Sequence, residues 1–386
     1  MQRLNINEHG RSPVSKLDST RFLRKVVVIA ALATSFQCMR PLVSVAHAET
    51  IRTPMEATET MRRFLASVDF GKKDEIDVIK AVHVYFRAGG PAGIKRDATR
   101  NARTDAPPRT NTETEKLGGD CSELSYYMLT TLSLALAERD VKLGAFEIHI
   151  KGDPPDVWHV VPFAIVTDGE EIAINDRKLV EKTHRVLNVN EGNVIFVDPQ
   201  AKQVGMLEPK IDAIVPTDIE GAKGMYFREH AMASAAKGNM DEALVAFKQA
   251  TELNPYDYIS LENVRVILTK KGKTDEAHEF IERIAARSKD DPNVKQILVT
   301  AKMNMALKLG GETKYKEAVA YIEQALELDP KNKTTKEVAS ELYNNYGIQL
   351  SSEGKIEEAK RALERAVALD SKNKTAKRNL GIIGKQ

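Results

Sequence analysis

The feature that most constrains the fold of this chain is a repeated pattern in its second half. A glutamate followed by an alanine recurs there at intervals of 34, 41 and 41 residues, and a bulky apolar residue follows each alanine four positions later. The repeated pairs are Glu242-Ala243, Glu276-Ala277, Glu317-Ala318 and Glu358-Ala359. This period predicts a stack of helical hairpins, because each repeat buries its apolar face against the next one.

Small residues recur where the two helices of one repeat are expected to touch. Together with the 34-residue period, they make residues 224–373 resemble tetratricopeptide (TPR) repeats, and Tyr343, Tyr346, Gly347 and Leu350 fill the first-helix pattern of the last repeat. The resemblance implies an all-α TPR solenoid over residues 220–386, with about four repeats and a C-terminal capping helix over 374–385. It also implies a protein or peptide partner in the concave face. The two 41-residue intervals predict longer helices or turns near 292–298 and 333–339.

Residues 1–48 have the pattern of a signal peptide. Arg21, Arg24 and Lys25 precede an apolar run, and Ala46-His47-Ala48 is a small-x-small cleavage site. The apolar run is about 11 residues long, whereas a membrane-spanning helix needs roughly 20. We therefore expect an exported chain, periplasmic or extracellular, with no stable membrane insertion after cleavage. An uncleaved membrane anchor is the alternative.

Removal of residues 1–48 changes the charge and the cysteine content. The full chain carries 57 Lys and Arg against 55 Asp and Glu, and the signal holds seven and two of these, which leaves 50 against 53. This slightly acidic balance argues against a nucleic-acid partner. Cys38 leaves with the signal, so Cys121 remains as the single cysteine and an internal disulfide is impossible.

Residues 49–215 are predicted to form an α+β domain with helices first and an antiparallel sheet after them. We expect one helix from a Thr53-Pro54 start to about Val68, and a second from about 74 to 87. The expected strands cover residues 145–151, 159–167, 171–175 and 193–197. Residues 91–117 lack periodicity and predict a long loop, either a solvated one or a lid that contacts substrate.

A glycine turn places Cys121 at the beginning of a predicted helix. Gly118-Gly119 precedes the cysteine, and an apolar stripe predicts a helix from Ser122 to about Arg139. The dipole and the unpaired N–H groups of a helix N-terminus favour a thiolate. A small buried cysteine with no reactivity is the alternative interpretation.

A thiol that transfers acyl groups needs a base, and the base needs an acceptor that holds its tautomer. The histidines outside the signal and the repeats are His83, His149, His159 and His184. We interpret His83 as an ordinary helix histidine. His159 begins a predicted strand downstream of Cys121, and Asp176 stands at the end of the next predicted strand.

In this order, the motifs resemble the transglutaminase-like (papain-like) cysteine enzyme superfamily. In that family a Gly-x-Cys turn opens a helix, a histidine starts a later strand and an aspartate ends the next one. The resemblance covers about residues 55–200 and implies a transglutaminase-like fold with Cys121 as nucleophile, His159 as general base and acid, and Asp176 as the residue that orients the imidazole. Asp198, in an Asp-Pro ending, is the alternative acid.

The implied mechanism is attack of the Cys121 thiolate on an amide carbonyl, with His159 protonating the leaving amine. The backbone N–H of Cys121 is the natural first donor to the oxyanion. Water as acceptor would make the protein a peptidase or deamidase, and a lysine amine would make it a transglutaminase.

The sequence predicts no cofactor and no metal, because it contains neither a ligand cluster nor a phosphate-binding glycine loop.

Three functions remain open at this point. The first is an exported cysteine enzyme whose TPR module binds its substrate or a partner. The second is a non-catalytic TPR adaptor or scaffold whose front domain only binds peptide. In the third, the repeats carry the main function, and the front domain anchors the protein to the cell wall or to a partner.

Overall fold

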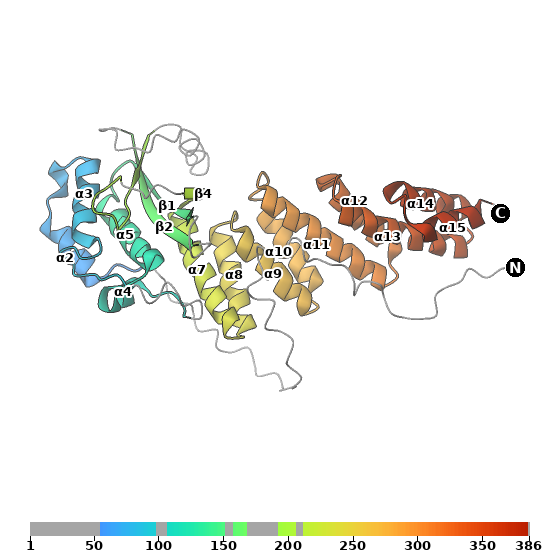
Figure 1. Cartoon of the computed structure of the whole chain (residues 1–386), viewed down its shortest axis with the longest axis horizontal. Helices are drawn as coiled ribbons and strands as arrows, with labels where there is room; N and C mark the ends of the chain where they lie inside the picture. Colours follow the sequence, from blue (N-terminus) through green and yellow to red (C-terminus); the bar gives the residue numbers. More distant parts are fainter. Residues whose placement is uncertain (1–54, 98–105, 151–156, 168–191, 206–210, 385–386) are drawn as a thin grey trace. The chain divides into compact units, whose positions relative to one another are not determined.

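A computed structural model describes residues 55–97, 106–150, 157–167, 192–205 and 211–384 (Figure 1). The expected signal peptide, the expected strand 171–175 and Asp176 lie outside these residues. In the described part of the chain, no helix is long and apolar enough to cross a membrane.

The first helices are set by their caps. Helix α2 (Glu59–Ser67) begins after Thr58, whose hydroxyl accepts a hydrogen bond from the Met61 backbone N–H. The expected start near Thr53-Pro54 is therefore wrong, because residues 55–58 are not helical. A short 3₁₀ turn, η3 (Phe70–Lys72), leads to α3 (Glu75–Phe86), which is capped by Asp74 and confirms the second expected helix.

The segment expected as a long loop over 91–117 contains a helix. Helix α4 (Asn111–Leu117) is fixed by a capping box between Thr110 and Glu113. The Asn111 amide donates to the Glu56 carbonyl and to the Thr130 hydroxyl, 2.9 Å in each case. Caps and one buried amide stabilise this helix, and the apolar periodicity used to predict helices is missing from it.

Helix α5 (Cys121–Ala135) ends before the predicted Arg139, and four strands accompany it in the sheet order β3-β2-β1-β4. The strands are β1 (Val141–Ile150), β2 (Val157–Val166), β3 (Asn193–Phe196) and β4 (Ile211–Asp218), and all neighbours are antiparallel. Three of them correspond to predicted strands. Strand β4 was not predicted, because Pro216 interrupts its pattern; at the sheet edge, where β4 lies, a proline is tolerated.

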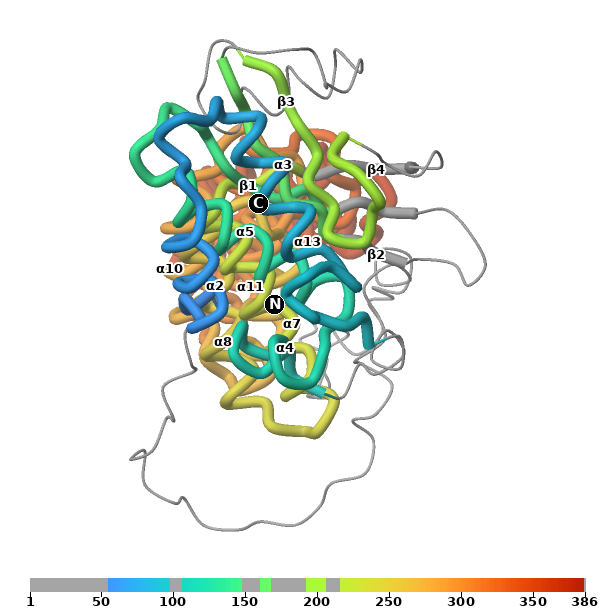
Figure 2. Tube along the Cα trace, turned by 90° about the vertical axis from the view of Figure 1, so that its left-hand side faces the viewer, coloured from blue at the N-terminus to red at the C-terminus, as the bar shows by residue number. Residues whose placement is uncertain are grey.

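Helices α2, α3 and α5 pack against one face of the sheet, and Figure 2 follows the backbone through them. Their core includes Phe64, Phe86 and Met128 from the helices, and Ala164 from β2. The other face carries a group of aromatic rings in which Phe146 contacts Phe163 and Phe196. Helix α5 is thus the central helix of the α/β part.

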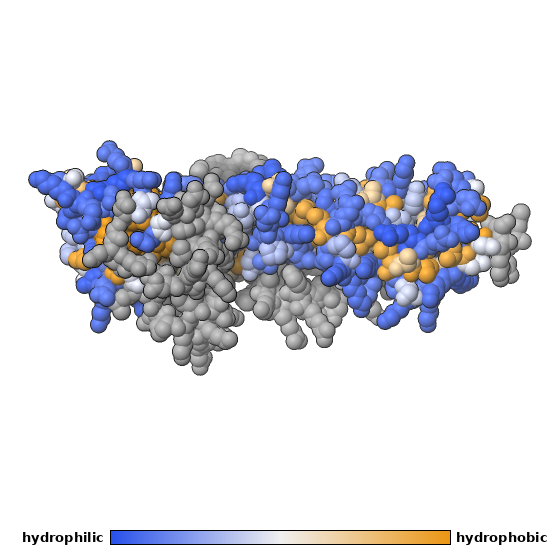
Figure 3. All heavy atoms as spheres, turned by 90° about the horizontal axis from the view of Figure 1, so that it is seen from above, coloured by the Kyte–Doolittle hydropathy of each residue, from blue (hydrophilic) through white to orange (hydrophobic). Residues whose placement is uncertain are grey.

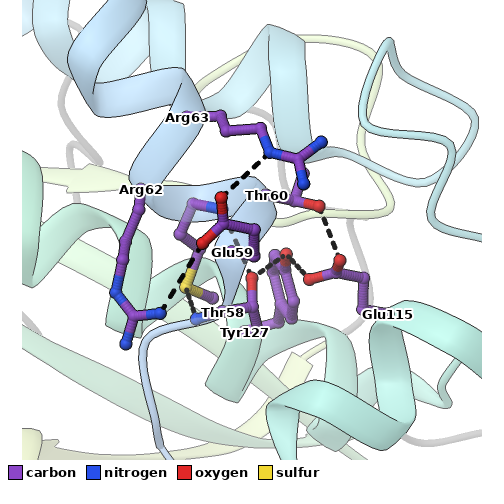
Figure 4. Close-up of polar contacts among 8 residues, drawn as sticks. Thr58, Glu59, Thr60, Arg62, Arg63, Glu115 and Tyr127 are labelled. Carbon is purple, nitrogen blue, oxygen red and sulfur yellow. Dashed lines mark hydrogen bonds and ion pairs between the residues drawn. The ribbon is translucent and has the colours of Figure 1, made fainter.

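A buried hydroxyl network joins α2, α4 and α5 (Figure 4). The Tyr127 hydroxyl donates to a Glu115 carboxylate oxygen at 2.9 Å and lies 3.0 Å from the Thr58 hydroxyl. Thr60 donates to the other oxygen of Glu115. The network satisfies polar groups that would be costly to bury alone, and it ties the α2 cap to α5.

From Ile219 onward the chain is helical and forms paired helices. The first helices of the pairs are α7 (Ile219–Ala236), α9 (Tyr258–Lys270), α11 (Pro292–Gly311) and α13 (Lys333–Ser352). Their partners are α8 (Met240–Leu253), α10 (Thr274–Ala285), α12 (Tyr315–Leu328) and α14 (Ile356–Leu369), followed by α15 (Lys374–Ile383). The 41-residue intervals correspond to longer first helices, since α11 and α13 have 20 residues and α9 has 13.

The small residues of the repeat pattern lie where paired helices touch. Ala243, Ala277, Ala318 and Ala359 are all buried. A Cβ on Gly347 of α13 would lie 2.7 Å from Leu363 of α14, so glycine permits this approach. The C-terminal region is therefore a solenoid of TPR-like helix pairs, with α15 packing on α13 and α14.

Candidate functional site

Cys121 is the first residue of α5, as the sequence predicted. The Asp120 side chain accepts from the Glu123 backbone N–H at 3.0 Å, and the Glu123 carboxylate accepts from the Asp120 N–H at 3.0 Å. This reciprocal capping box fixes the backbone on both sides of the cysteine. The side chain of Cys121 is partly exposed, and it is the one cysteine among the residues that the structure describes.

The two glycines before Cys121 are required by close backbone packing. Gly118 has a φ of 81°, and a Cβ there would lie 2.8 Å from the Lys95 carbonyl oxygen. A Cβ on Gly119 would lie 2.9 Å from atoms of both Thr114 and Glu123. The turn therefore brings the chain tightly into α5 and leaves little freedom at its first residue.

Helix α5 is anchored to the strand that carries His159. The buried Ser125 hydroxyl, one turn after Cys121, donates to the Val160 carbonyl at 2.6 Å. His159 precedes Val160 in β2 and pairs with Ile148 of β1. The backbone of position 159 therefore lies near the beginning of α5. The roles of His159, of Asp176 and of the Cys121 backbone N–H stay predictions.

Asp198, the alternative acid, follows β3 and lies beside β2. The Val197 N–H donates to the Pro162 carbonyl at 2.8 Å, which continues the β2–β3 pairing toward His159. The Asp198 side chain accepts from the Gln200 N–H at 2.8 Å. Strand pairing thus brings Asp198 close to the strand of the predicted base, although the two positions are far apart in the sequence.

His83 is fully buried and contacts the same segment. Its Nε2 lies 2.9 Å from the Asp198 carbonyl oxygen, so this nitrogen carries the hydrogen and donates. Burial lowers the pKa of His83, although the hydrogen bond to Asp198 opposes that effect. A neutral, buried imidazole agrees with the interpretation of His83 as a structural helix histidine.

Helix α7 brings a group of charged residues to the α5 side of the first repeat. Arg228 pairs with Glu147 of β1 and lies 3.4 Å from a carboxylate oxygen of Asp257. Although burial acts to lower the pKa of Arg228, the two carboxylates raise it, so the guanidinium stays charged. Burial raises the pKa of its neighbour Glu229 to about 8, and the negative charges of Asp120 and Glu123 add to that effect. None of these α7 residues was predicted from the sequence to be functional.

The first helices of the second, third and fourth repeats, and α15 after them, carry a row of asparagines that was not predicted to be functional either. Asn263, Asn304 and Asn345 each precede the alanine of their own repeat by 14 positions, and Asn379 follows Ala359 by 20 positions, as Asn263 follows Ala243. The asparagine row consists of Asn263, Asn304, Asn345 and Asn379. Asn344, next to the row, connects two of its members: the Asn379 amide donates to the Asn344 side-chain oxygen at 2.8 Å, and the Asn344 amide donates to the Asn345 side-chain oxygen at 3.2 Å. The constant offset was the signal that could have revealed the row.

An apolar row runs beside the asparagines, one helical turn further on. It consists of Met232, Val266, Leu307, Ile348 and Ile382, and each of these side chains is at least partly exposed. On the face seen in Figure 3, apolar residues gather over the repeats. In the asparagine row, Asn304 and Asn345 are at least partly exposed, whereas the Asn263 amide donates to the Ile259 carbonyl at 2.8 Å and Asn379 is buried. The two rows together place amide groups and apolar side chains on adjacent positions of the same helices.

A family model for the tetratricopeptide repeat matches residues 229–257, 301–332 and 340–373. The chain therefore contains TPR repeats, which serve as a protein-binding module. Among curated proteins, none matches this chain. The transglutaminase-like fold of the front region stays a prediction.

Several solved structures resemble the chain. MamA 41-end from Desulfovibrio magneticus RS-1 is 16% identical, with 42% of this chain and 84% of that chain covered and a TM-score of 0.28. YrrB, described as a TPR protein with an unusual peptide-binding site, is 14% identical, with 40% and 90% covered and a TM-score of 0.25. The thermophilic TPR protein TTC0263 from Thermus thermophilus is 16% identical, with 42% and 100% covered and a TM-score of 0.23.

Proposed function

We propose that this protein is an adaptor that binds an extended segment of a protein or peptide partner along the first helices of its repeats. The observation that carries the proposal is the asparagine row beside the apolar row. A side-chain amide both donates and accepts, so it can pair with the N–H and C=O groups of an extended backbone whatever the partner's sequence. The apolar row would contact alternate side chains of the same segment.

The test begins with random-sequence peptides displayed on phage and selected on the full chain. The best peptide is then measured by fluorescence anisotropy against wild type and the double variant Asn304→Ala/Asn345→Ala. We expect binding to weaken about tenfold or more, since several hydrogen bonds of about 1 kcal/mol each would be lost. Asn293→Ala, an exposed asparagine of α11 outside the row, should bind as wild type does. Equal binding by all three proteins would refute the proposal.

A second function, cysteine-dependent acyl transfer, is supported by the position of Cys121. It lies at a capped helix start, behind a constrained glycine turn, and Ser125 ties the same helix to β2 beside His159. In the proposed reaction the Cys121 thiolate attacks an amide carbonyl, and the C–N bond breaks as His159 gives the leaving amine a proton. Water or a second amine then cleaves the thioester. Asp176, or Asp198 in its place, would orient His159.

Alkylation by iodoacetamide, read by mass on the peptide that contains Cys121, tests this second function. A thiol poised for catalysis should react well below pH 8.5, about the pKa of an unperturbed cysteine. His159→Gln should remove that reactivity at neutral pH, and His230→Gln, in the first repeat, should keep it. Reaction only above about pH 8.5 in every protein would leave the adaptor function alone.

The proposed function also includes a cellular location for the protein. With residues 1–48 acting as a cleaved signal, the adaptor would work in a periplasmic or extracellular compartment. N-terminal sequencing of the protein recovered from its native cell should then begin near Glu49, and an intact Met1 terminus would contradict export by cleavage.

A further inference from the structure

Every backbone N–H and C=O group of the turn before Cys121 is hydrogen-bonded. In residues 118–120, four of these six groups pair with other backbone groups and two pair with side chains. One of the two side chains is Glu123, which completes the capping box of α5. The other is Arg109, whose guanidinium Nη1 donates to the Gly118 carbonyl at 2.6 Å. Among the described residues, Arg109 is therefore the one side chain outside α5 that pairs with the backbone of this turn.

The Arg109 guanidinium also reaches a second segment that contacts the turn. It forms an ion pair with Asp97 at 3.1 Å, and the two side chains are only 18% and 22% exposed. The backbone N–H of Asp97 donates to the Gly119 carbonyl at 2.9 Å. The Asp97 main chain and the Arg109 side chain thus hold two consecutive carbonyls of the turn, and their ion pair joins them.

The main chain of Arg109 contacts α5 itself. Its N–H donates to Oε1 of Glu123 at 2.7 Å, while Oε2 of the same carboxylate accepts from the Asp120 N–H at 3.0 Å. Glu123 is buried at 1% exposure, so its carboxylate depends on such donors. Arg109 therefore contacts the chain on both sides of Cys121, at Gly118 three residues before it and at Glu123 two residues after it.

The bond between Arg109 and Gly118 controls the conformation of the turn. Gly118 is buried, so loss of the guanidinium would leave its carbonyl as a buried acceptor without this donor. Rotation of the carbonyl toward water would relieve that cost, and a glycine has no Cβ to resist the rotation. Because Cys121 follows as the first residue of α5, a change in this turn moves the thiol relative to the first N–H groups of the helix.

We propose that Arg109 is a positioning residue for Cys121, which fixes the Gly118 carbonyl and so holds the thiol at the N-terminal end of α5, where a helix stabilises a thiolate. This inference rests on the second proposed function, the reactivity of Cys121. In this role Arg109 acts on the protein's own backbone rather than on a substrate.

The experiment compares the rate of Cys121 alkylation by iodoacetamide in the full chain of wild type, Arg109→Met and Arg139→Met. Methionine keeps an unbranched apolar side chain and removes the guanidinium. Arg139 is the matched control, because it too pairs with a carboxylate, Glu75 at 2.9 Å, and donates to a backbone carbonyl. Its side chain is 19% exposed, and it follows the opposite end of α5.

We expect Arg109→Met to react about threefold to tenfold more slowly than wild type at about pH 7 and at the same rate at about pH 9.5. At neutral pH the rate depends on how well the helix stabilises the thiolate, whereas at about pH 9.5 an ordinary thiol is already ionised. Arg139→Met should follow wild type. Arg109→Lys keeps a charged donor but lacks the planar fork, so its profile should lie between those of Arg109→Met and wild type.

Circular dichroism and urea unfolding of each variant show whether a changed rate reflects loss of the fold. If Arg109→Met does not fold, Arg109→Lys decides: slower alkylation at neutral pH supports the proposal, and a profile equal to that of wild type overturns it. If folded Arg109→Met reacts faster than wild type at every pH, the guanidinium only shields the thiol, and the proposal is overturned.

The remaining outcomes separate this inference from the cysteine function. If wild-type Cys121 reacts below about pH 8.5 and Arg109→Met has the same profile, the positioning role is overturned and the cysteine function stands. If Cys121 reacts only above about pH 8.5 in every folded protein, the cysteine function fails and the positioning role fails with it. Slower alkylation of Arg109→Met at neutral pH, with Arg139→Met unchanged, supports the proposal.

Discussion

The α/β part and the TPR repeats hold their residues together in different ways. In the α/β part, decisive hydrogen bonds join residues far apart in the chain, such as Thr58 with Tyr127 and His83 with Asp198. In the repeats, the buried alanines and Gly347 bring together helices that follow one another directly. The first region therefore depends on long-range closure of the chain, and the second on a pattern repeated at short range.

Helix α7 belongs to both regions. Tyr226 lies edge-on to Tyr126 of α5, with ring centroids 6.0 Å apart, and Ala222 and Met225 share that core. On another side, α7 pairs with α8 as the first helix of repeat one. A substitution of a buried charge on α7 should therefore affect both regions at once.

The largest effect is expected for Arg228→Ala. The change leaves Glu147 buried without its cation, and Asp257 loses a partner as well, because Arg228 contacts both. Breaking a buried ion pair by removing one partner costs about 3–5 kcal/mol. Urea unfolding should show this loss. Spectroscopic signals from the two regions should change together, because Arg228 of α7 contacts both Glu147 of β1 and Asp257, the N-cap of α9.

Arg365→Ala is the matched control. Arg365 contacts Glu323 through two nitrogens at 3.0 Å each, yet about half of its side chain is exposed. An exposed pair of this kind contributes less than about 1 kcal/mol. If the two variants were equally stable, burial of the Arg228 pair would not be what links the two regions.

A smaller and more local effect is expected for Gly347→Ala. The new Cβ would lie 2.7 Å from Leu363 and 3.2 Å from the Ala359 carbonyl oxygen, so α13 and α14 would have to separate. Overpacking of this kind costs about 1–3 kcal/mol. Hydrogen exchange should accelerate in α13 and α14 and stay unchanged in α3 and α5.

Gly381→Ala in α15 tests the same substitution without the clash. A Cβ at Gly381 meets nothing within 4 Å. Alanine favours a helix over glycine by roughly 1 kcal/mol, so this variant should be as stable as wild type or more so. For Gly347→Ala itself, faster hydrogen exchange in α3 and α5 as well would contradict a local response of the repeats.

The same contrast explains how much the sequence could predict. The alanines recur at intervals of 34, 41 and 41 residues, so the helix pairs and the longer α11 and α13 were predictable from this repeat. The capped start of α5 at Cys121 was predictable too, because the signals lie within a few adjacent residues. Local information was sufficient in both places.

Features that depend on distant partners were not predictable. Helix α4 has no apolar stripe and is held by Asn111 through Thr130, 19 residues away. Strand β4 contains Pro216 and becomes a strand because β1 offers an edge. The approach of Arg228 to Glu147 joins residues 81 apart. In each case a partner distant in the sequence contributes contacts that the segment alone does not show.

Ser125→Ala tests one of these long-range ties in the α/β part. The hydroxyl donates to the Val160 carbonyl at 2.6 Å in a buried setting, so its loss should cost about 1 kcal/mol. Ser133→Ala on the same helix removes a bond to Thr130 of its own helix and should cost less. Urea unfolding gives both values. Equal losses would mean that the tie between α5 and β2 contributes no more than a local hydrogen bond.

The smallest effect is expected at a turn where one repeat departs from the others. Gly238, Gly272 and Gly354 have φ near 80° in the turns between paired helices, and the third repeat places Thr313 there with φ 61°. A β-branched residue in the left-handed region is strained, so Thr313→Gly should raise the free energy of unfolding by about 0.5–1 kcal/mol. The reciprocal change Gly272→Thr should lower it by a similar amount or more. Thermal unfolding of both variants is the measurement. If Thr313→Gly were destabilising instead, the threonine would be making a contact specific to the third repeat, and the repeats would be less equivalent than their spacing indicates.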